Sequence, residues 1–553
     1  MSDPLARVST VATPQSRPIP GRAQVRNAAG GYVFAKDLWT QVEDFLILGT
    51  TGGTYYASAD KLTEANVDVL FDAVTEDGPR LVSLITEIST ARPPRAPKPR
   101  PALFALAAAA ATGDPATVQA VKAAFPEVVR TTDHLATFFG YWKNLAGKAG
   151  ADGRRPSPVI GRAMRTTLGS FFTADDIHQV AFRAVKARQR VTPSGEAMAL
   201  RDIIRIAHPT GPTPAHRALI GWLAGKVSDE EARAALTDVD DYLTARAATT
   251  PGEAIAVIRD RRVPWEFLAP DVLADPGVWT ELAQTVGLTA LIRNLARMTR
   301  IGALAPFADV ASVVAGRLAD GDALARARVH PMDLYLAYKA YSSGRSQPAP
   351  RTPAQTWQPV GAISDALADA YELSFGAVEP SGRRLLVTVD SSGSMCGWAQ
   401  VVSGGSPLGS GYEVANAVAA MLARIEGGNV HVIDVDTAVH ASKVTPRTSL
   451  RELAGWRGSG GGTDLSLPFS WALARSLDVD GIIVLTDSET WAGRQHPVQA
   501  LEAYRRLVNR HVRVVVVSMT ATGMVVAEPA QAGVLNVAGL DASLPRVITA
   551  FLR

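Results

Sequence analysis

Hydrophobic and polar positions divide the chain into two parts with different periods. From about residue 36 to about residue 340, apolar residues recur at spacings of three and four, as in residues 63–74 and 176–190. This spacing places the apolar side chains on one face of an α-helix. Short breaks rich in glycine and proline, such as residues 208–214, separate these segments. Helix pairs in this rhythm predict an α-solenoid, although no strict sequence period repeats.

The pattern changes near residue 383. Short apolar runs rich in β-branched residues, typical of buried strands, lie at residues 383–390, 429–436, 481–488 and 512–520. Helical spacing follows in the segments between them and at the end of the chain, at residues 412–426, 467–477, 497–510 and 542–553. Strands that alternate with helices predict a doubly wound parallel α/β sheet covered on both faces.

The two patterns predict a multidomain protein, because 553 residues are too many for one hydrophobic core. We predict a flexible N-terminal tail over residues 1–25 and a helical-repeat module over residues 26–342. A Pro-rich segment and one helix after it form a linker over residues 343–382. The α/β domain then spans residues 383–553.

Composition narrows the class of protein. Hydrophobic residues make up 47% and charged residues 20%, as in ordinary globular proteins. No apolar run reaches the roughly 18 residues of a transmembrane helix, and the N-terminus lacks the apolar core of a secretory signal. The single cysteine, Cys396, excludes an internal disulfide framework. Together these features predict a cytoplasmic protein without a membrane partner.

Charge is concentrated in one region. The formal net charge is only +3, but residues 80–217 hold 20 Lys and Arg against 9 Asp and Glu, a local charge of +11. Such a region suits a polyanion such as nucleic acid. The alternative is a solvated helical surface with a basic bias.

Polar side chains gather where the predicted strands end. Asp390, Ser392 and Ser394 follow the first strand, Asp487 follows the third, and Thr463 lies in a Gly-rich loop before a helix. Ligand sites of doubly wound folds lie at the carboxyl ends of the strands. Two carboxylates and three hydroxyls form an all-oxygen set, which suits Mg²⁺ and, alternatively, Mn²⁺ or Ca²⁺. Taken singly, each residue would equally suit a turn or a helix cap.

The combination of D-x-S-x-S, G-G-T-D and T-D resembles the metal-ion-dependent adhesion site of von Willebrand factor A domains. The helical part resembles the TROVE module of the Ro autoantigen family, bacterial members included. An ordered series of blocks carries this second resemblance, at residues 27–34, 45–67, 100–110, 128–142, 161–165, 263–268, 288–298 and 330–344.

The resemblance implies an architecture and a function. HEAT-like repeats would close into a ring with a basic central hole, completed by the von Willebrand A domain. The outer surface would bind small noncoding Y-like RNA, and the hole would accept single-stranded 3′ ends of misfolded RNA. The protein would act as a monomeric scaffold, not an enzyme, in RNA quality control, processing or decay with an exoribonuclease such as polynucleotide phosphorylase.

The resemblance also implies RNA-binding residues. Lys186 and Arg190 lie four residues apart on one helical face, and with His208 they match the segment that contacts Y RNA in the family. Residues 191–200 are longer than the usual turn, which leaves the place of His208 open. A plain solvated face and a helix C-cap are the alternatives for these three residues. The blocks that match the hole contain Arg130, Thr132, His134, Arg162, Arg165, Arg293, Arg328 and His330.

Two other classes of function compete with this hypothesis. In a metal-dependent protein-interaction module without essential RNA binding, an acidic side chain of a partner would complete the metal coordination. A metal-dependent hydrolase would need a general base near the oxygen cluster, and His431 and His440 form no recognised pattern with it. Cys396 as a nucleophile lacks a paired histidine motif.

Overall fold

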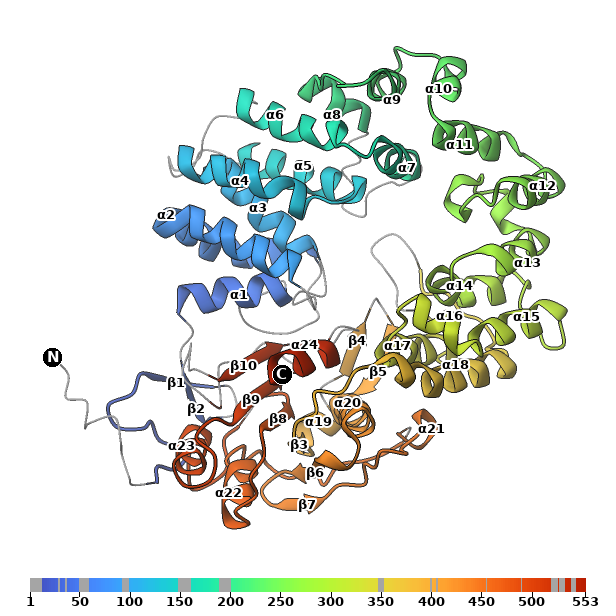
Figure 1. The fold of residues 1–553 in the computed structure, drawn as a ribbon. Coiled ribbons are helices and arrows are strands. Elements are labelled where there is room, and N and C mark those ends of the chain that lie inside the picture. The colour runs from blue at the N-terminus through green and yellow to red at the C-terminus, as the bar shows by residue number, and fades with distance from the viewer. Residues whose placement is uncertain are drawn as a thin grey trace.

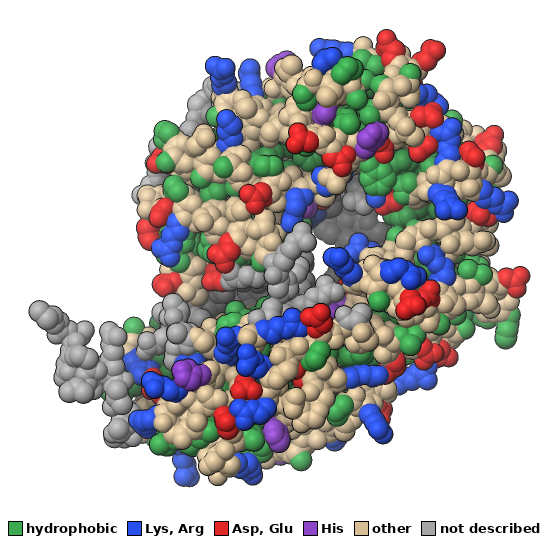
Figure 2. All heavy atoms as spheres, in the orientation of Figure 1, with side chains coloured by type: hydrophobic (Ala, Val, Ile, Leu, Met, Phe, Trp, Pro, Cys, Tyr) green, Lys and Arg blue, Asp and Glu red, His purple; other side chains and the backbone are tan. Residues whose placement is uncertain are grey.

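The computed structural model describes residues 12–27, 30–34, 37–48, 59–91, 99–147, 161–187, 200–346, 353–397, 400–403, 406–453, 455–488, 490–518, 526, 533–538 and 544–553. Figure 1 shows an arc of helices with an α/β domain lying between its two ends, so that the chain forms a ring. Figure 2 shows that the centre of the ring is hollowed on this face and that Lys and Arg side chains lie at its rim.

Eighteen α-helices of the described residues form the arc. They are α1 (Leu38–Leu48), α2 (Ala59–Thr90), α3 (Arg100–Thr112), α4 (Pro115–Val128), α5 (Thr132–Gly147), α6 (Arg162–Ser170), α7 (Ile177–Ala187), α8 (Leu200–Ala207), α9 (Pro214–Ala224), α10 (Asp229–Ala235), α11 (Thr237–Ala247), α12 (Pro251–Arg261), α13 (Pro276–Thr285), α14 (Leu288–Arg300), α15 (Asp309–Leu318), α16 (Gly321–Arg326), α17 (Pro331–Ser342) and α18 (Gly361–Ser374). The last of these packs against α17 and α15, so the predicted connecting helix adds a final layer to the solenoid.

Many of these helices begin in the same way. A capping side chain precedes a proline at the first helical position in α4, α9, α12, α13 and α17. The cap accepts a hydrogen bond from a backbone N–H of the first turn, and proline has no N–H that would need a partner there. The Gly/Pro breaks of the sequence therefore contain the starts of the helices they separate.

The α/β domain contains a six-stranded sheet in the order β10-β9-β8-β3-β6-β7. Its strands are β3 (Leu385–Asp390), β6 (Val430–Val435), β7 (Val439–Ala441), β8 (Gly481–Thr486), β9 (Arg513–Ser518) and β10 (Val534–Ala538). Its helices are α19 (Gly393–Gly397), α20 (Gly411–Glu426), α21 (Leu450–Leu453), α22 (Leu467–Ala474), α23 (Pro497–Leu507) and α24 (Leu544–Leu552), and β4 (Gln400–Ser403) pairs with β5 (Ser406–Ser410) as a hairpin.

Helices cover both faces of the sheet, as predicted. On one face Leu386 and Ile482 pack with Phe469 of α22 and Leu501 of α23. On the other face the alternate residues, such as Val387, pack with α20. All six residues of β3 are buried, which explains why its sequence is continuously apolar up to Asp390.

The sheet is not wholly parallel. The strands β10, β9, β8, β3 and β6 run parallel to their neighbours, and β7 pairs antiparallel with β6 at the edge. The prediction of a parallel sheet missed both edge strands. Each is short, and β7 follows β6 after only Asp436, Thr437 and Ala438. No helical segment separates the two strands, so the strand–helix alternation of the sequence does not indicate β7.

Residues 12–25, which belong to the predicted flexible tail of 1–25, contact the α/β domain at several points, although most of them are exposed. Gln15 is fully buried, and Ile19 packs with Phe34 and Val498 of α23. The segment leads into a hairpin of β1 (Gln24–Arg26) and β2 (Tyr32–Phe34), which lies beside α23 in Figure 1. Its polar composition suggested a tail, but its polar groups form hydrogen bonds to the α/β domain.

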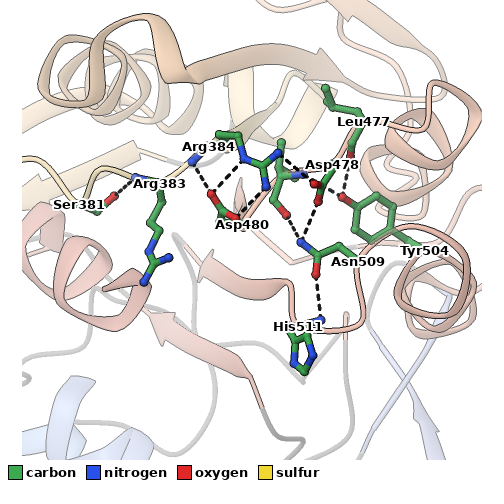
Figure 3. A network of polar contacts seen from close by, with 10 residues as sticks. Ser381, Arg383, Arg384, Leu477, Asp478, Asp480, Tyr504, Asn509 and His511 are labelled. Atoms are coloured by element: carbon green, nitrogen blue, oxygen red, sulfur yellow. Dashed lines mark hydrogen bonds and ion pairs between the residues drawn. The ribbon is translucent and has the colours of Figure 1, made fainter.

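A polar network fixes the amino-terminal edge of the sheet (Figure 3). The guanidinium of Arg384 donates to Asp478 and to Asp480, each at 3.0 Å. Asn509 Nδ2 donates to Asp478 Oδ1 at 3.0 Å, and the hydroxyl of Tyr504 donates to the carbonyl of Leu477. The carboxylates at this edge therefore have a cation from the chain itself.

Candidate metal centre and basic residues of the ring

Asp390 occupies the carboxyl end of β3, in the middle of the sheet, and its side chain is fully buried. Its Oδ1 accepts from the N–H of Ser392 at 2.9 Å, and its Oδ2 accepts from the hydroxyl of Thr486 at 2.6 Å. Burial, followed by the charge of Asp487, raises the pKa of Asp390 to about 7. By contrast, the hydrogen bond from Arg384 lowers the pKa of Asp480 at the opposite edge.

Asp487 reaches the same point from the neighbouring strand. It follows β8, which pairs in parallel register with β3, and its side chain is 3% exposed. Two buried carboxylates at adjoining strand ends repel each other, and a bound divalent cation would relieve that repulsion. Within the described chain, no group of three or more His, Cys, Asp or Glu is arranged to hold a metal, so a cation here would depend on hydroxyls and water.

The serines follow Asp390 on a tight turn. The hydroxyls of Ser392 and Ser394 lie 3.3 Å apart, and Ser392 is almost fully buried. A Gly-rich loop packs directly against this turn: the N–H of Gly393 donates to the carbonyl of Gly461 at 3.0 Å. A Cβ on Gly458 would lie 2.7 Å from the carbonyl oxygen of Ser391, so only glycine fits there.

Thr463 continues that Gly-rich loop and is 2% exposed. Its carbonyl accepts from the N–H groups of Trp491 and Ala492, at 3.2 and 3.0 Å. The loop that carries Thr463 therefore contacts both the serine turn and the segment after Asp487. The structure brings the loops of all five predicted ligands to one edge of the sheet, and their oxygens are the donors that a hard cation prefers.

The residues predicted to contact Y RNA differ in their surroundings. Lys186, in α7, forms an ion pair with Glu266 at 2.8 Å, and its side chain is 31% exposed. His208 is exposed just after α8, where its N–H donates to the carbonyl of Ile204 and its φ of 47° is left-handed, as at a helix C-terminus. Arg190 lies outside the described residues.

Two residues predicted for the central hole are buried and have structural partners. Thr132 is 6% exposed, and its hydroxyl donates to the carbonyl of Arg183. His330 is 2% exposed, and its Nδ1 accepts from the N–H of Met332 as the N-cap of α17. The burial of both side chains disfavours a direct contact with RNA. The HP and TD sequences at these positions mark helix starts.

The other predicted residues are accessible to different degrees. His134 is half-buried, and burial lowers its pKa. Arg130 is exposed and donates to the carbonyl of Ser89 at 3.0 Å. The remaining arginines have exposed side chains on or beside α6, α14 and α16; they are Arg162, Arg165, Arg293 and Arg328.

Comparisons with known proteins give the family. The Ro60 von Willebrand factor A domain family matches residues 384–552, and the TROVE domain family matches residues 259–357. The RNA-binding protein RO60 of Deinococcus radiodurans is 34% identical over 559 residues, which cover 100% of this chain and 99% of that protein. This chain belongs to the Ro60 family.

Two further similarities agree with this assignment. The RNA-binding protein RO60 of Caenorhabditis elegans is 28% identical, over 96% of this chain and 90% of that protein. The crystal structure of the Deinococcus radiodurans RO (RSR) protein has a TM-score of 0.72 and 33% identity, and covers 94% of this chain and 99% of that chain. The predicted family and the predicted fold, a helical ring completed by a von Willebrand A domain, are confirmed.

Sequence reasoning missed several residues that shape the metal-site candidate of this Ro60-family chain. Thr486 donates to Asp390, and its place directly before Asp487 was a usable signal. Asp436 directly follows β6; burial raises its pKa, but hydrogen bonds from Ser459 and His440 outweigh burial and lower the pKa to about 2. Gln15, far away in the sequence, gave no signal.

Cys396 lies beneath the Gly-rich loop. It is half-buried, and burial raises the pKa of its thiol, which disfavours the thiolate that a nucleophile needs. Its Sγ is 3.7 Å from the carbonyl oxygen of Ser391. Among the helices of the described chain, none has the length and apolar character that crossing a bilayer requires.

Proposed function

We propose that this protein is an RNA-binding scaffold. It binds a small noncoding Y-like RNA on the outer surface of the helical ring and single-stranded 3′ ends of misfolded RNA in the central hole. The observation that carries the proposal is the 34% identity, over the whole chain, with a protein named as RNA-binding. The basic rim of the hollow in Figure 2 supports it.

Exposed arginines supply the contacts to phosphate. Arg162 and Arg165 lie three residues apart in the first turns of α6, so both can meet one RNA backbone. Neither forms an ion pair with another described residue, so phosphate binding breaks no existing contact. Lys186 binds phosphate only after it leaves Glu266, which lowers its contribution.

The proposed role is quality control, processing or decay of RNA in the cytoplasm, as a monomer that presents RNA to an exoribonuclease such as polynucleotide phosphorylase. The chain itself acts as a scaffold and not as an enzyme. The surroundings of Asp390 support this, since its hydrogen bonds come from Ser392 and Thr486 and not from a histidine placed as a general base.

The second candidate function concerns the metal centre. We propose that Asp390, Ser392, Ser394, Thr463 and Asp487 hold Mg²⁺, directly or through water, with Mn²⁺ or Ca²⁺ as substitutes. When bound, the cation offers a coordination position to an acidic side chain of a protein partner. The buried carboxylate of Asp390, which lacks a cationic partner within the described chain, favours this proposal.

Charge reversal tests the RNA proposal. The double variant Arg162→Glu/Arg165→Glu should weaken binding of a single-stranded RNA and reduce the slope of log affinity against log salt by about 0.7 per lost phosphate contact. The matched control is Arg506→Glu/Arg510→Glu, two exposed arginines of the α/β domain with the same change of charge. Equal effects of both doubles would show that binding reflects net charge and not the ring surface.

A further inference from the structure

The N-terminal segment of residues 12–27 buries one polar side chain completely. Gln15 is 0% exposed, although the residues around it are largely polar or prolines. Its amide lies between two loops of the α/β domain that are more than 440 residues away in the sequence. We propose that Gln15 is a positioning residue for the metal centre, because it ties the loop that carries Thr463 to the loop that follows Asp487.

The amide of Gln15 is satisfied on both sides. Its Nε2 donates to Asp464 Oδ1 at 3.0 Å, and Asp464 is the residue directly after Thr463. Its Oε1 accepts from the hydroxyl of Thr490, three residues after Asp487. One side chain therefore joins the neighbours of two predicted metal ligands.

Its two partners reach the ligand loop themselves. Thr490 Oγ1 lies 3.2 Å from the carbonyl oxygen of Thr463 and accepts from the N–H of Leu465 at 3.4 Å. Asp464 donates its N–H to the carbonyl of Asp436 at 2.9 Å, next to the serine turn. When the amide of Gln15 is lost, both Asp464 and Thr490 lose a buried partner, and the loop of Thr463 is held to the segment after Asp487 only by its direct hydrogen bonds, such as those from Trp491 and Ala492.

The far end of the same segment converges on Thr490. Asn27 Nδ2 donates to the carbonyl of Thr490 at 2.8 Å, and Asn27 Oδ1 accepts from the N–H of Gly31 at 2.7 Å. A Cβ on Gly31 would lie 2.2 Å from that carbonyl oxygen, so the hairpin presses directly on the loop. The segment thus clamps the loop from two points 12 residues apart in the sequence.

The chemistry of an amide suits this position. A lysine or arginine beside Asp464 would add a positive charge next to the site where the divalent cation binds. The neutral amide donates a hydrogen bond to Asp464 and leaves the negative potential of the site intact. Residues that orient metal ligands from the outer layer commonly change metal affinity by about 10- to 100-fold when they are replaced.

This role rests on the proposed metal centre, and the test separates the two. Mg²⁺ and Mn²⁺ affinities are measured by calorimetry on the full chain, and the gain in Tm on adding Mg²⁺ to chelator-treated protein is measured in parallel. Gln15→Glu, which keeps the acceptor for Thr490 and loses the donor to Asp464, should weaken metal binding about 10-fold. The gain in Tm should shrink accordingly.

Conservative replacements of Thr490 provide the second arm. Thr490→Val keeps the shape and removes the hydroxyl, so it should reproduce the loss, whereas Thr490→Ser should restore near wild-type affinity. The matched control is Arg22→Ala, in the same N-terminal segment. It removes the ion pair between Arg22 and Glu502 of α23, whose charged atoms lie 2.8 Å apart. It should lower Tm equally with and without metal and leave the affinity unchanged.

The outcomes are distinct. In one outcome, wild type binds metal and Asp390→Ala does not, while Gln15→Glu has wild-type metal affinity and a Tm that is lower by the same amount with and without metal. Gln15 then has only a structural role, so this inference is wrong although the metal centre stands. The same holds if Thr490→Val keeps full affinity. Absence of binding by wild type would overturn the metal centre and the role of Gln15 together.

Discussion

At the scale of single residues, Asp390 is a buried carboxylate whose charged form is destabilised by its surroundings. Its partners are an N–H and a hydroxyl, and its neighbour Asp487 is also an acid. Burial and the charge of Asp487 favour the protonated form without a metal, although the two hydrogen bonds favour the ionised form. Asp390 therefore suits a cation that the described part of the chain does not supply, unlike Asp480, which has Arg384.

This arrangement predicts a pH dependence of stability. In metal-free protein the native state keeps the proton of Asp390 up to about pH 7, whereas an unfolded aspartate releases it near pH 3.8. Between these values the native state binds more protons, so raising the pH lowers the free energy of unfolding, by at most about 1.4 kcal/mol per pH unit.

Thermal unfolding in the presence of a chelator measures this effect, between pH 4.5 and 7.5 at intervals of roughly half a pH unit. Asp390→Asn should flatten the profile, and Mg²⁺ should stabilise wild type most at the upper end of the range. An identical profile for wild type and Asp390→Asn would exclude Asp390 as the titrating group.

His330 gives a second prediction at this scale. As the N-cap of α17, it accepts from Met332, so His330→Ala should destabilise the protein by about 1 kcal/mol without a change in RNA affinity. His330→Asn, which retains a capping acceptor, should recover most of the stability. Chemical denaturation and RNA titration of the same preparations measure both quantities, and a selective loss of RNA affinity would return His330 to the binding surface.

At the scale of elements, the turn around residues 265–267 places an acidic side chain beside the basic face of α7. Lys186 lies over the ring of Phe182 and pairs with Glu266, whose side chain is only 17% exposed. A helix face with the spacing of a binding surface can thus be partly neutralised by an element that sequence spacing does not place beside it. The exposed arginines of α6 have no such partner among the described residues.

Releasing Lys186 should strengthen binding if it contacts phosphate. We expect Glu266→Gln to raise RNA affinity about 1.4- to fivefold, which corresponds to the roughly 0.2–1 kcal/mol of an accessible ion pair. Filter binding at two salt concentrations measures the change, and Glu281→Gln, which releases Arg259 of α12, is the matched control. No change with Glu266→Gln would place Lys186 outside the RNA contact.

At the scale of the whole molecule, the α/β domain completes the ring through charged contacts with the last helices. Lys339 of α17 pairs with Glu413 of α20 at 2.5 Å, with side chains 22% and 14% exposed. Arg424 pairs with Glu372, and Arg451 pairs with Asp365. The hairpin of β4 and β5 also packs against α17, as Figure 1 shows. This junction joins the helical module to the α/β domain.

The pair of Lys339 and Glu413, which is the less exposed one, should contribute most to the stability of that junction. Glu413→Gln leaves the half-buried Lys339 without its partner, which should cost about 2 kcal/mol. Arg451→Met removes a pair whose side chains are 60% and 63% exposed and should cost less than about 1 kcal/mol. Urea unfolding and limited proteolysis compare the two variants, and equal costs would mean that burial does not control the strength of this junction.

The helices and the central strands can be predicted from the sequence alone, because their signals are local. The period of apolar residues gave the helices and four central strands, and the polar residues after β3 and β8 gave Asp390, Ser392, Ser394 and Asp487 as one candidate site. Parallel strands bring their carboxyl ends to one edge, so a local motif predicted a contact across about 100 residues.

What each side chain faces depends on the folded chain. Burial and capping disfavour RNA contact by Thr132 and His330, and Lys186 pairs with Glu266, which its helical spacing does not reveal. The place of Gln15 depends on contacts with residues more than 440 positions away. Such contacts leave no periodic or compositional trace, because a hydrogen bond depends on the position of two groups in space and not on their separation along the chain.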